Sequence, residues 1–176
     1  MESRNDRTAI DIAAELKKQL EIGVEPMEGA AQHNLDIIGW TKFITTFKPK
    51  SIIELGTGSG AFYQFLRKWI PWGRTIDNKD TSDFIDDFIN LDIFSKQDTI
   101  KELIETAPKP LVLFCDNGNK PREVKEYSKY LSDNDFLVVH DFEIEIRAED
   151  IPEEFELLEI SGLTAFFKNK QQKSKE

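Results

Sequence analysis

The sequence predicts an α/β fold: a doubly wound, Rossmann-like sheet of seven mostly parallel strands with a C-terminal antiparallel hairpin and helices on both faces. From Ser51 onward, short apolar runs alternate with segments of helical periodicity. Continuous apolar strands separated by helices indicate a parallel sheet that is covered on both faces. Residues 155–169 have the pattern of two strands joined by Ser161 and Gly162, which predicts the antiparallel hairpin.

The apolar runs locate the parallel strands, and right-handed crossovers between them give the doubly wound order. The expected strands cover residues 51–55, 74–77, 89–94, 111–115 and 136–140. The expected helices between them cover residues 62–70, 95–107 and 120–131. Ser95 and Asp98 form a predicted capping box, and Pro121 suits a first helical turn.

Two further helices are expected before the sheet, at residues 8–23 and 34–47. Apolar spacing of three and four residues predicts both of them. In the second, one face carries Ile37, Trp40, Thr41, Ile44 and Phe47.

Composition narrows the class of protein. The 176 residues suffice for one domain with a buried core, and a hydrophobic content of 39% is that of a globular chain. A net charge of −10 argues against nonspecific binding to nucleic acid. The N-terminal residues have no apolar core, so we expect neither a signal peptide nor a membrane span. The single cysteine, Cys115, favours a reducing cytoplasm.

Glycines alternate directly after the first expected strand, in the sequence ELGTGSG from Glu54 to Gly60. Gly56, Gly58 and Gly60 lack a Cβ, so the backbone there can take positive φ and approach a ligand closely. In an open parallel sheet, ligands bind beyond the carboxyl ends of the strands. We therefore expect a ligand cradle rather than a tight turn alone.

Two classes of ligand suit this loop. It satisfies the loose dinucleotide pattern, so a nicotinamide cofactor is one candidate. The other candidate is a ligand with an amino-acid ammonium group. Glu54 favours this second class, because a carboxylate ahead of the turn is awkward beside a pyrophosphate but suits an ammonium. Asp77, at the end of the second expected strand, can accept hydrogen bonds from a ribose in either case. Asp92, near the end of the third, could accept a hydrogen bond from an exocyclic amine.

Residues 51–169 resemble the class I S-adenosylmethionine-dependent methyltransferases. The resemblance rests on ELGTGSG, Asp77, the sequences NLDIF, LVLFCDNG and FLVVHD, and the final hairpin. In that family the glycine loop lies against the amino-acid end of the cofactor, the second-strand acid binds the ribose and the third-strand acid binds the adenine amine. The resemblance implies S-adenosylmethionine as cofactor, bound by Glu54, Gly56, Thr57, Gly58, Ser59, Gly60, Asp77, Asp92 and Asp116.

The residues after the fourth and fifth strands are most similar to small-molecule O-methyltransferases of the catechol type and the cephalosporin-hydroxylase-like group. The chain lacks the Asn/Asp-Pro-Pro-aromatic sequence of enzymes that methylate base amino groups. In the two O-methyltransferase groups, residues at these positions bind a divalent cation. Carried over, Asp116 and Asp141 match these positions, whereas the chain has His140 where the family has an acidic or amide residue. A histidine ligand would shift the preference towards softer metals such as Mn, Fe or Zn. The ligands of a Mg or Mn ion would then be Asp116, His140 and Asp141.

Other roles remain open for this group. His140 could be the general base, acting with Asp116, or a buried strand-end histidine with one hydrogen bond. Lys120 is expected to be a solvated helix start, although it could instead stabilise an oxyanion. Residues 141–159 are strongly acidic, and they either attract a cationic acceptor or form a solvated face.

The resemblance implies a methyltransferase acting on a hydroxyl oxygen of a small molecule, with or without a metal. The alternatives are an N-methyltransferase acting on a small molecule or protein side chain, and a cofactor-binding module without turnover. We expect no nucleic-acid or membrane partner, and a homodimer is considered because the chain offers little material for a substrate pocket.

The chain is expected to divide into three regions. N-terminal helices in residues 1–48 would cover the active site, residues 49–169 would form the methyltransferase domain, and residues 170–176 would be a disordered polar tail. Gln32 and His33 are candidate residues in the cover.

Overall fold

The computed structural model describes residues 34–79 and 85–170. The expected first helix at residues 8–23, the candidates Gln32 and His33, and all of the expected tail except Lys170 lie outside the described residues. Among the residues described, no helix combines the length and the apolar character that crossing a bilayer requires.

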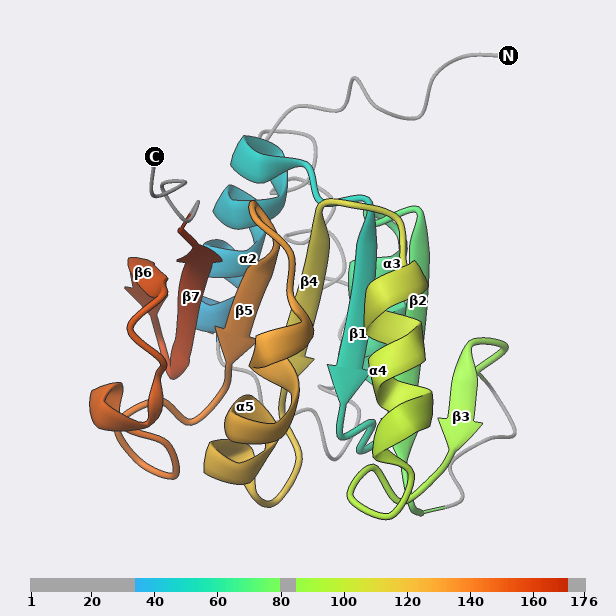
Figure 1. Ribbon diagram of the computed structural model, residues 1–176. Coiled ribbons are helices and arrows are strands. Elements are labelled where there is room, and N and C mark those ends of the chain that lie inside the picture. Colours follow the sequence, from blue (N-terminus) through green and yellow to red (C-terminus); the bar gives the residue numbers. More distant parts are fainter. Residues whose placement is uncertain (1–33, 80–84, 171–176) are drawn as a thin grey trace.

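One seven-stranded sheet forms the centre of the molecule, in the order β3-β2-β1-β4-β5-β7-β6 (Figure 1). Five strands are parallel: β1 (Ser51–Leu55), β2 (Trp72–Asp77), β3 (Phe88–Asn90), β4 (Leu111–Cys115) and β5 (Phe136–Val139). The C-terminal hairpin comprises β6 (Phe155–Ser161) and β7 (Thr164–Asn169), and β7 runs antiparallel to both β5 and β6. The predicted fold class is confirmed.

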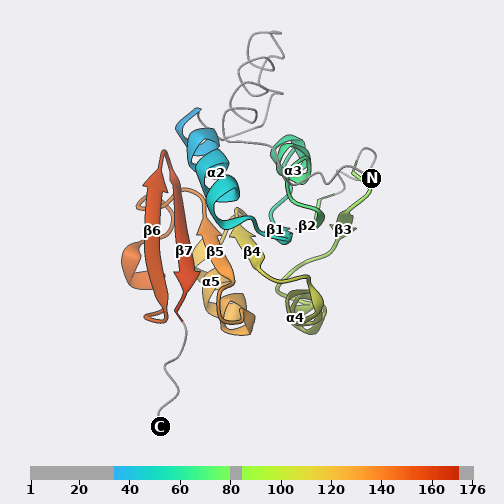
Figure 2. The same cartoon turned by 90° about the horizontal axis from the view of Figure 1, so that it is seen from above.

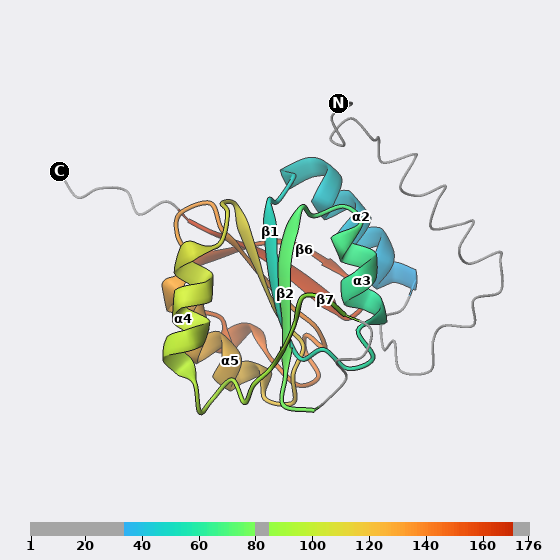
Figure 3. The ribbon, with the colours of Figure 1, turned by 90° about the vertical axis from the view of Figure 1, so that its right-hand side faces the viewer.

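Helices cover both faces of this sheet (Figures 2 and 3). On one face lie α2 (Asn34–Phe47) and α3 (Ala61–Arg67), and on the other lie α4 (Gln97–Thr106) and α5 (Lys120–Tyr127). Two short 3-10 segments, η2 (Ser128–Tyr130) and η3 (Ala148–Asp150), follow α5 and β5.

The core is divided between the two faces because successive strand side chains point to opposite sides. In β4, Phe114 packs towards α2 and α3, whereas Leu113 packs towards α4 and α5. The first cluster is rich in aromatic rings: Trp40 of α2 is fully buried and makes edge contacts with Phe114 and Phe166. This helix is therefore fixed to the sheet by its predicted apolar face.

Three local expectations are wrong. The strand expected at 89–94 ends at Asn90, since the chain then turns and the Asp92 carboxylate accepts a hydrogen bond from the Phe94 amide at 3.0 Å. The expected capping box does not form, because Lys96 is the N-cap of α4 and has no side-chain capping bond. The turn of the hairpin consists of Gly162 and Leu163 rather than Ser161 and Gly162.

Asp36, in the first turn of α2, connects this helix to the hairpin turn. It is fully buried, and its Oδ1 accepts hydrogen bonds from the Leu163 amide at 2.9 Å and the Thr164 hydroxyl at 2.8 Å. We expect Asp36→Ala to lower the free energy of unfolding by about 2 kcal/mol, because both donors lose a buried acceptor. Urea denaturation measures this, with the exposed Asp133→Ala as the control. A change no larger than that of the control would contradict it.

Candidate active site

The glycine loop joins β1 to α3 at the carboxyl end of the sheet. Gly56, Gly58 and Gly60 all have positive φ, of 97°, 52° and 73°. A Cβ on Gly56 would lie 2.5 Å from the backbone oxygen of Asp116, so the loop approaches the end of β4 more closely than any other residue allows. A Cβ on Gly58 would meet no atom of residues 34–79 and 85–170 within 4 Å. The loop is thus closely packed at one glycine and borders open space at the next.

Asp77, the last residue of β2, holds this loop. Its Oδ2 accepts hydrogen bonds from the amides of Thr57 at 3.1 Å and Gly58 at 3.4 Å. Its Oδ1 accepts one from the Lys79 amide at 3.0 Å. The side chain predicted to bind a ribose therefore lies directly against the glycine loop, as two adjacent parallel strands require.

Glu54 lies within the sheet and is 2% exposed. Its Oε2 accepts a hydrogen bond from the Thr75 hydroxyl at 2.5 Å. The same Thr75 hydroxyl lies 2.8 Å from the Thr57 hydroxyl. Burial raises the pKa of Glu54 well above its usual value; the bond from Thr75 opposes this, and the charges of Asp116 and Asp77 add to it. Two threonine hydroxyls thus connect a carboxyl group of raised pKa to the loop.

Asp92 is exposed and lines an open pocket of about 160 Å³ beyond the ends of β2, β3 and β4. Its neighbours there are Asn78, Leu91, Ile93, Phe94, Asn117, Gly118 and Asn119. Because Asn78 directly follows Asp77, this pocket continues from the residue that holds the glycine loop.

A second group of polar residues follows β4 and β5. His140 Nδ1 lies 3.2 Å from Asp116 Oδ1 and 3.3 Å from Asp141 Oδ2. Carboxylates only accept hydrogen bonds, so this geometry assigns the proton to Nδ1. Nε2 is buried and has no hydrogen-bond partner among the described residues. The structure therefore brings together the three residues that the sequence predicted as a catalytic or metal-binding group.

Lys120 is also part of this group, and the expectation that it is solvated is wrong. Its side chain is 4% exposed. Its Nζ lies 2.7 Å from Glu145 Oε2, 3.0 Å from Asp141 Oδ2 and 3.8 Å from Asp116 Oδ1. The lysine is the first residue of α5, whose N-cap Asn119 accepts a hydrogen bond from the Arg122 amide. The start of the helix thus directs an ammonium into the acidic group.

The charges in this group change its protonation. Burial works to lower the pKa of His140, but the hydrogen bond to Asp116 and the charges of Asp116, Asp141 and Asp36 raise it overall. Burial also works to lower the pKa of Lys120, and the bonds to Glu145 and Asp141 with the nearby carboxylate charges raise it overall. The cationic forms of both side chains are therefore favoured.

A divalent cation would need the same carboxylate atoms. Asp116, His140 and Asp141 each offer one ligand atom, and these atoms lie within 4.8 Å of one another. However, Asp141 Oδ2 already contacts the buried Lys120 ammonium, and His140 Nδ1 presents its proton rather than a lone pair. In this arrangement the residues do not fit a divalent cation.

Thr75 and Glu145 were missed as members of the site, and Lys120 was considered only as an alternative, for stabilising an oxyanion. One signal pointed to Lys120, since it stands four residues after Asp116 where a helix begins. Glu145 lies in an acidic run that gave no reason to single out one carboxylate.

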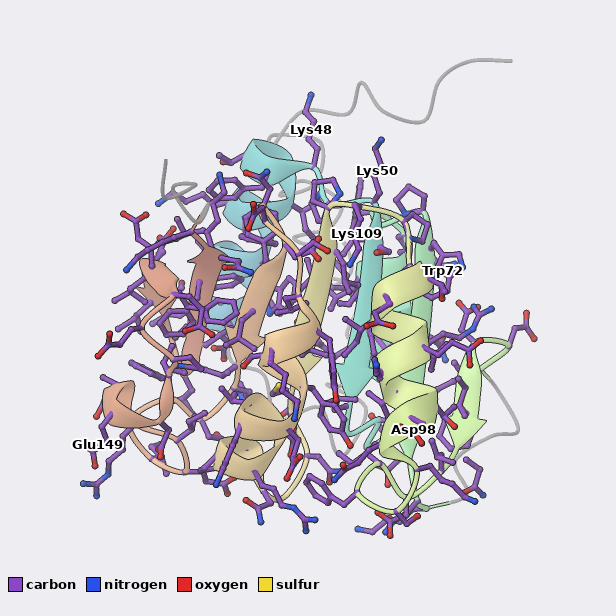
Figure 4. The ribbon with its side chains drawn as sticks, in the orientation of Figure 1. Lys48, Lys50, Trp72, Asp98, Lys109 and Glu149 are labelled. Carbon is purple, nitrogen blue, oxygen red and sulfur yellow. The ribbon has the colours of Figure 1, made fainter. Side chains whose placement is uncertain are left out.

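Charge is distributed unevenly along the strand direction. Figure 4 shows Lys48, Lys50 and Lys109 where β1 and β4 begin, whereas Asp98 and Glu149 lie towards the opposite end. Exposed acids near the carboxyl ends include Asp92, Glu143, Glu145 and Glu149. Several exposed acidic side chains thus lie at the same end of the strands as the candidate site.

No family model matches this chain, and no curated protein matches it. Solved structures do match. The MycE methyltransferase of the mycinamycin biosynthetic pathway, in complex with Mg and SAH, has a TM-score of 0.55 and 10% sequence identity over 76% of this chain and 48% of that protein. The chain has the Rossmann-like methyltransferase fold.

Other proteins with this methyltransferase fold differ in what they methylate. The N-methyltransferase NodS from Bradyrhizobium japonicum WM9, in complex with S-adenosyl-l-homocysteine, has a TM-score of 0.53 and 14% identity over 90% of this chain and 98% of that protein. The ribosomal protein L11 methylase from Lactobacillus delbrueckii subsp. bulgaricus has a TM-score of 0.52 and 13% identity, with 83% of each chain covered. This chain spans about half the length of MycE, and at these identities the likeness shows the fold alone.

Proposed function

We propose that this chain is an S-adenosylmethionine-dependent methyltransferase that transfers the methyl group to a hydroxyl oxygen of a small molecule. The glycine loop carries the proposal: it is held by Asp77 and borders open space at Gly58, in the place where this fold binds ligands. Solved proteins with this fold that contain S-adenosylhomocysteine support the choice of cofactor.

The cofactor residues then have distinct roles. The loop from Gly56 to Gly60 would lie along the amino-acid end, with Glu54 close to the ammonium. Asp77 would accept hydrogen bonds from the ribose, and Asp92 would accept one from the adenine amine in the adjoining pocket. Each of these acids either lies beside the loop or lines the open pocket next to it.

The transfer needs little chemistry from the protein, because the methyl carbon on a sulfonium is already electrophilic. The chain must align donor and acceptor and remove a proton. We assign these tasks to Asp116 and His140. Asp116 is partly exposed and its backbone borders the glycine loop, so it can contact an acceptor hydroxyl and take its proton. The Nδ1–H of His140 would hold that carboxylate in position.

A divalent cation is the alternative means of activating the acceptor. Bound by Asp116, His140 and Asp141, Mg or Mn would lower the pKa of the acceptor hydroxyl, and MycE was solved with Mg. For this chain, the cation would first have to displace the Lys120 ammonium from Asp141 and the proton from His140 Nδ1.

Transfer to nitrogen is the second candidate function. The exposed carboxylates of Glu143, Glu145 and Glu149 favour it, since they would attract a cationic acceptor. The resemblance to catechol-type enzymes favours oxygen. Turnover that Asp116→Asn abolishes would distinguish either enzyme from a binding module, which has none, and cofactor affinity measured alongside shows whether Asp116 also contacts the cofactor.

The proposal extends to the cover of the site, the cellular location of the protein and its oligomeric state. We propose that the first turn of α2 borders the site, since it contacts the hairpin turn at the carboxyl end of β5. The single, buried cysteine suits a cytoplasmic protein. A homodimer would supply additional walls for the acceptor pocket.

Calorimetric titration with S-adenosylmethionine, S-adenosylhomocysteine and NAD tests the choice of cofactor. We expect the first two to bind, and Asp77→Ala to weaken both by roughly 100-fold, because a ribose acceptor and two loop contacts are lost together. Glu54→Ala should weaken them as well, and the exposed Asp133→Ala should not. Binding of NAD alone, or of none of the three, would disprove the methyltransferase proposal.

A further inference from the structure

The acidic group after β4 and β5 already contains a cation. Three carboxylates, those of Asp116, Asp141 and Glu145, lie within 4.0 Å of the Lys120 Nζ. The lysine has a side-chain exposure of only 4%. Glu145 and Asp141 are close enough to accept hydrogen bonds from the ammonium, and Asp116, at 3.8 Å, adds negative charge.

The ammonium is fixed by the backbone as well as by charge. Lys120 begins α5 immediately after the N-cap Asn119, and Pro121 follows it in the first turn. The lysine stem therefore starts from a backbone whose dihedral angles are restricted by the following proline. A divalent ion coordinated by Asp141 Oδ2 would lie about 2 Å from that oxygen, whereas Nζ is already 3.0 Å from it.

We propose that the Lys120 ammonium is the resident cation of this group and that it takes the place of a divalent metal. It neutralises part of the charge of Asp116 and Asp141, whose carboxylates hold the His140 proton on Nδ1, so that the group positions an acceptor without a metal. The part of this proposal that concerns positioning of a methyl acceptor rests on the proposed function. The part that concerns cation binding by the acidic group does not.

Mn²⁺ binding followed by electron paramagnetic resonance tests the proposal without any acceptor or cofactor. Binding to a protein reduces the signal of free Mn²⁺. Adding the unaltered protein to millimolar Mn²⁺ should leave this signal unchanged. Lys120→Met should bind Mn²⁺ at least roughly tenfold more tightly, because the carboxylates lose their internal cation. Adding Asp141→Asn to Lys120→Met should abolish the gained binding. Lys120→Arg, which retains a cation, is the matched control and should behave like the unaltered protein.

Micromolar Mn²⁺ binding by the unaltered protein that Asp141→Asn abolishes would overturn the proposal. So would a folded Lys120→Met variant that gains no affinity. Circular dichroism shows whether this variant folds; if it does not, Lys120→Gln, which keeps a polar end, replaces it under the same expectations. Titration of S-adenosylhomocysteine in the presence of EDTA separates the two proposals. If S-adenosylhomocysteine does not bind in that titration, the proposed methyltransferase function is disproved, whereas the Mn²⁺ result is unaffected.

Discussion

Gly58→Ala is expected to weaken the binding of S-adenosylhomocysteine by about 100-fold or more, equivalent to roughly 2.7 kcal/mol, while the protein remains folded. A methyl group at this position meets no atom of the described residues within 4 Å, so it would project into the space proposed for the cofactor. The cost to folding should be only about 1–2 kcal/mol, because alanine then occupies the left-handed region.

Calorimetry and urea denaturation measure these two effects separately. Asn134→Ala is the matched control, since Asn134 also has a positive φ, 69°, and precedes β5 at the other end of the sheet. It should reduce stability slightly and leave cofactor affinity unchanged. Unaltered affinity in a folded Gly58→Ala variant would mean that the cofactor does not lie on the loop.

Glu123 should make the protein less stable as the pH rises from 5 to 8. Its side chain is fully buried in α5, and burial raises its pKa to about 8 even though the amides of Asn117 and Asn119 donate hydrogen bonds to it and the Lys120 charge is close. Between the unfolded value near 4.5 and about 8, the folded protein retains a proton that the unfolded chain has released. Stability therefore falls with rising pH in this interval.

Glu123→Gln removes this dependence, because a glutamine cannot ionise and its carbonyl oxygen can still accept a backbone hydrogen bond. Between pH 5 and pH 8, the free energy of unfolding of the unaltered protein should fall by about 3 kcal/mol more than that of the variant. Urea denaturation at both pH values measures the difference, with the exposed Glu102→Gln as the control. Parallel pH profiles for the unaltered protein and Glu123→Gln would show that Glu123 does not titrate in this interval.

The sequence predicted the fold and most of the site's residues for one physical reason. Parallel strands present their carboxyl ends at one edge, so residues that follow separate strands meet in space. This is why Asp77 lies against the glycine loop and why Asp116 lies beside His140. The catalytic and cofactor roles of these residues stay predictions until binding and turnover are measured.

The burial of charged side chains was not predicted. Lys120 and Glu123 lie one turn or less apart in α5, and such side chains are exposed by default in sequence reasoning. Their burial depends on distant segments: Glu145 and Asp141, which contact Lys120, come from the loop after β5. The loop itself has unusual backbone geometry, with positive φ at both Asp141 and Glu143. Apolar periodicity carries no information about such a contact.

The exposed acids near the carboxyl ends of the strands, Asp92, Glu143, Glu145 and Glu149, place negative charge beside the proposed site. S-adenosylmethionine carries a net charge of +1 from its sulfonium, ammonium and carboxylate groups, whereas S-adenosylhomocysteine is neutral overall. If S-adenosylmethionine binds there as proposed, these acids would attract the positively charged methyl donor more strongly than the neutral spent form. Capture of the reactant and release of the product would both be favoured by the same uneven placement of charge.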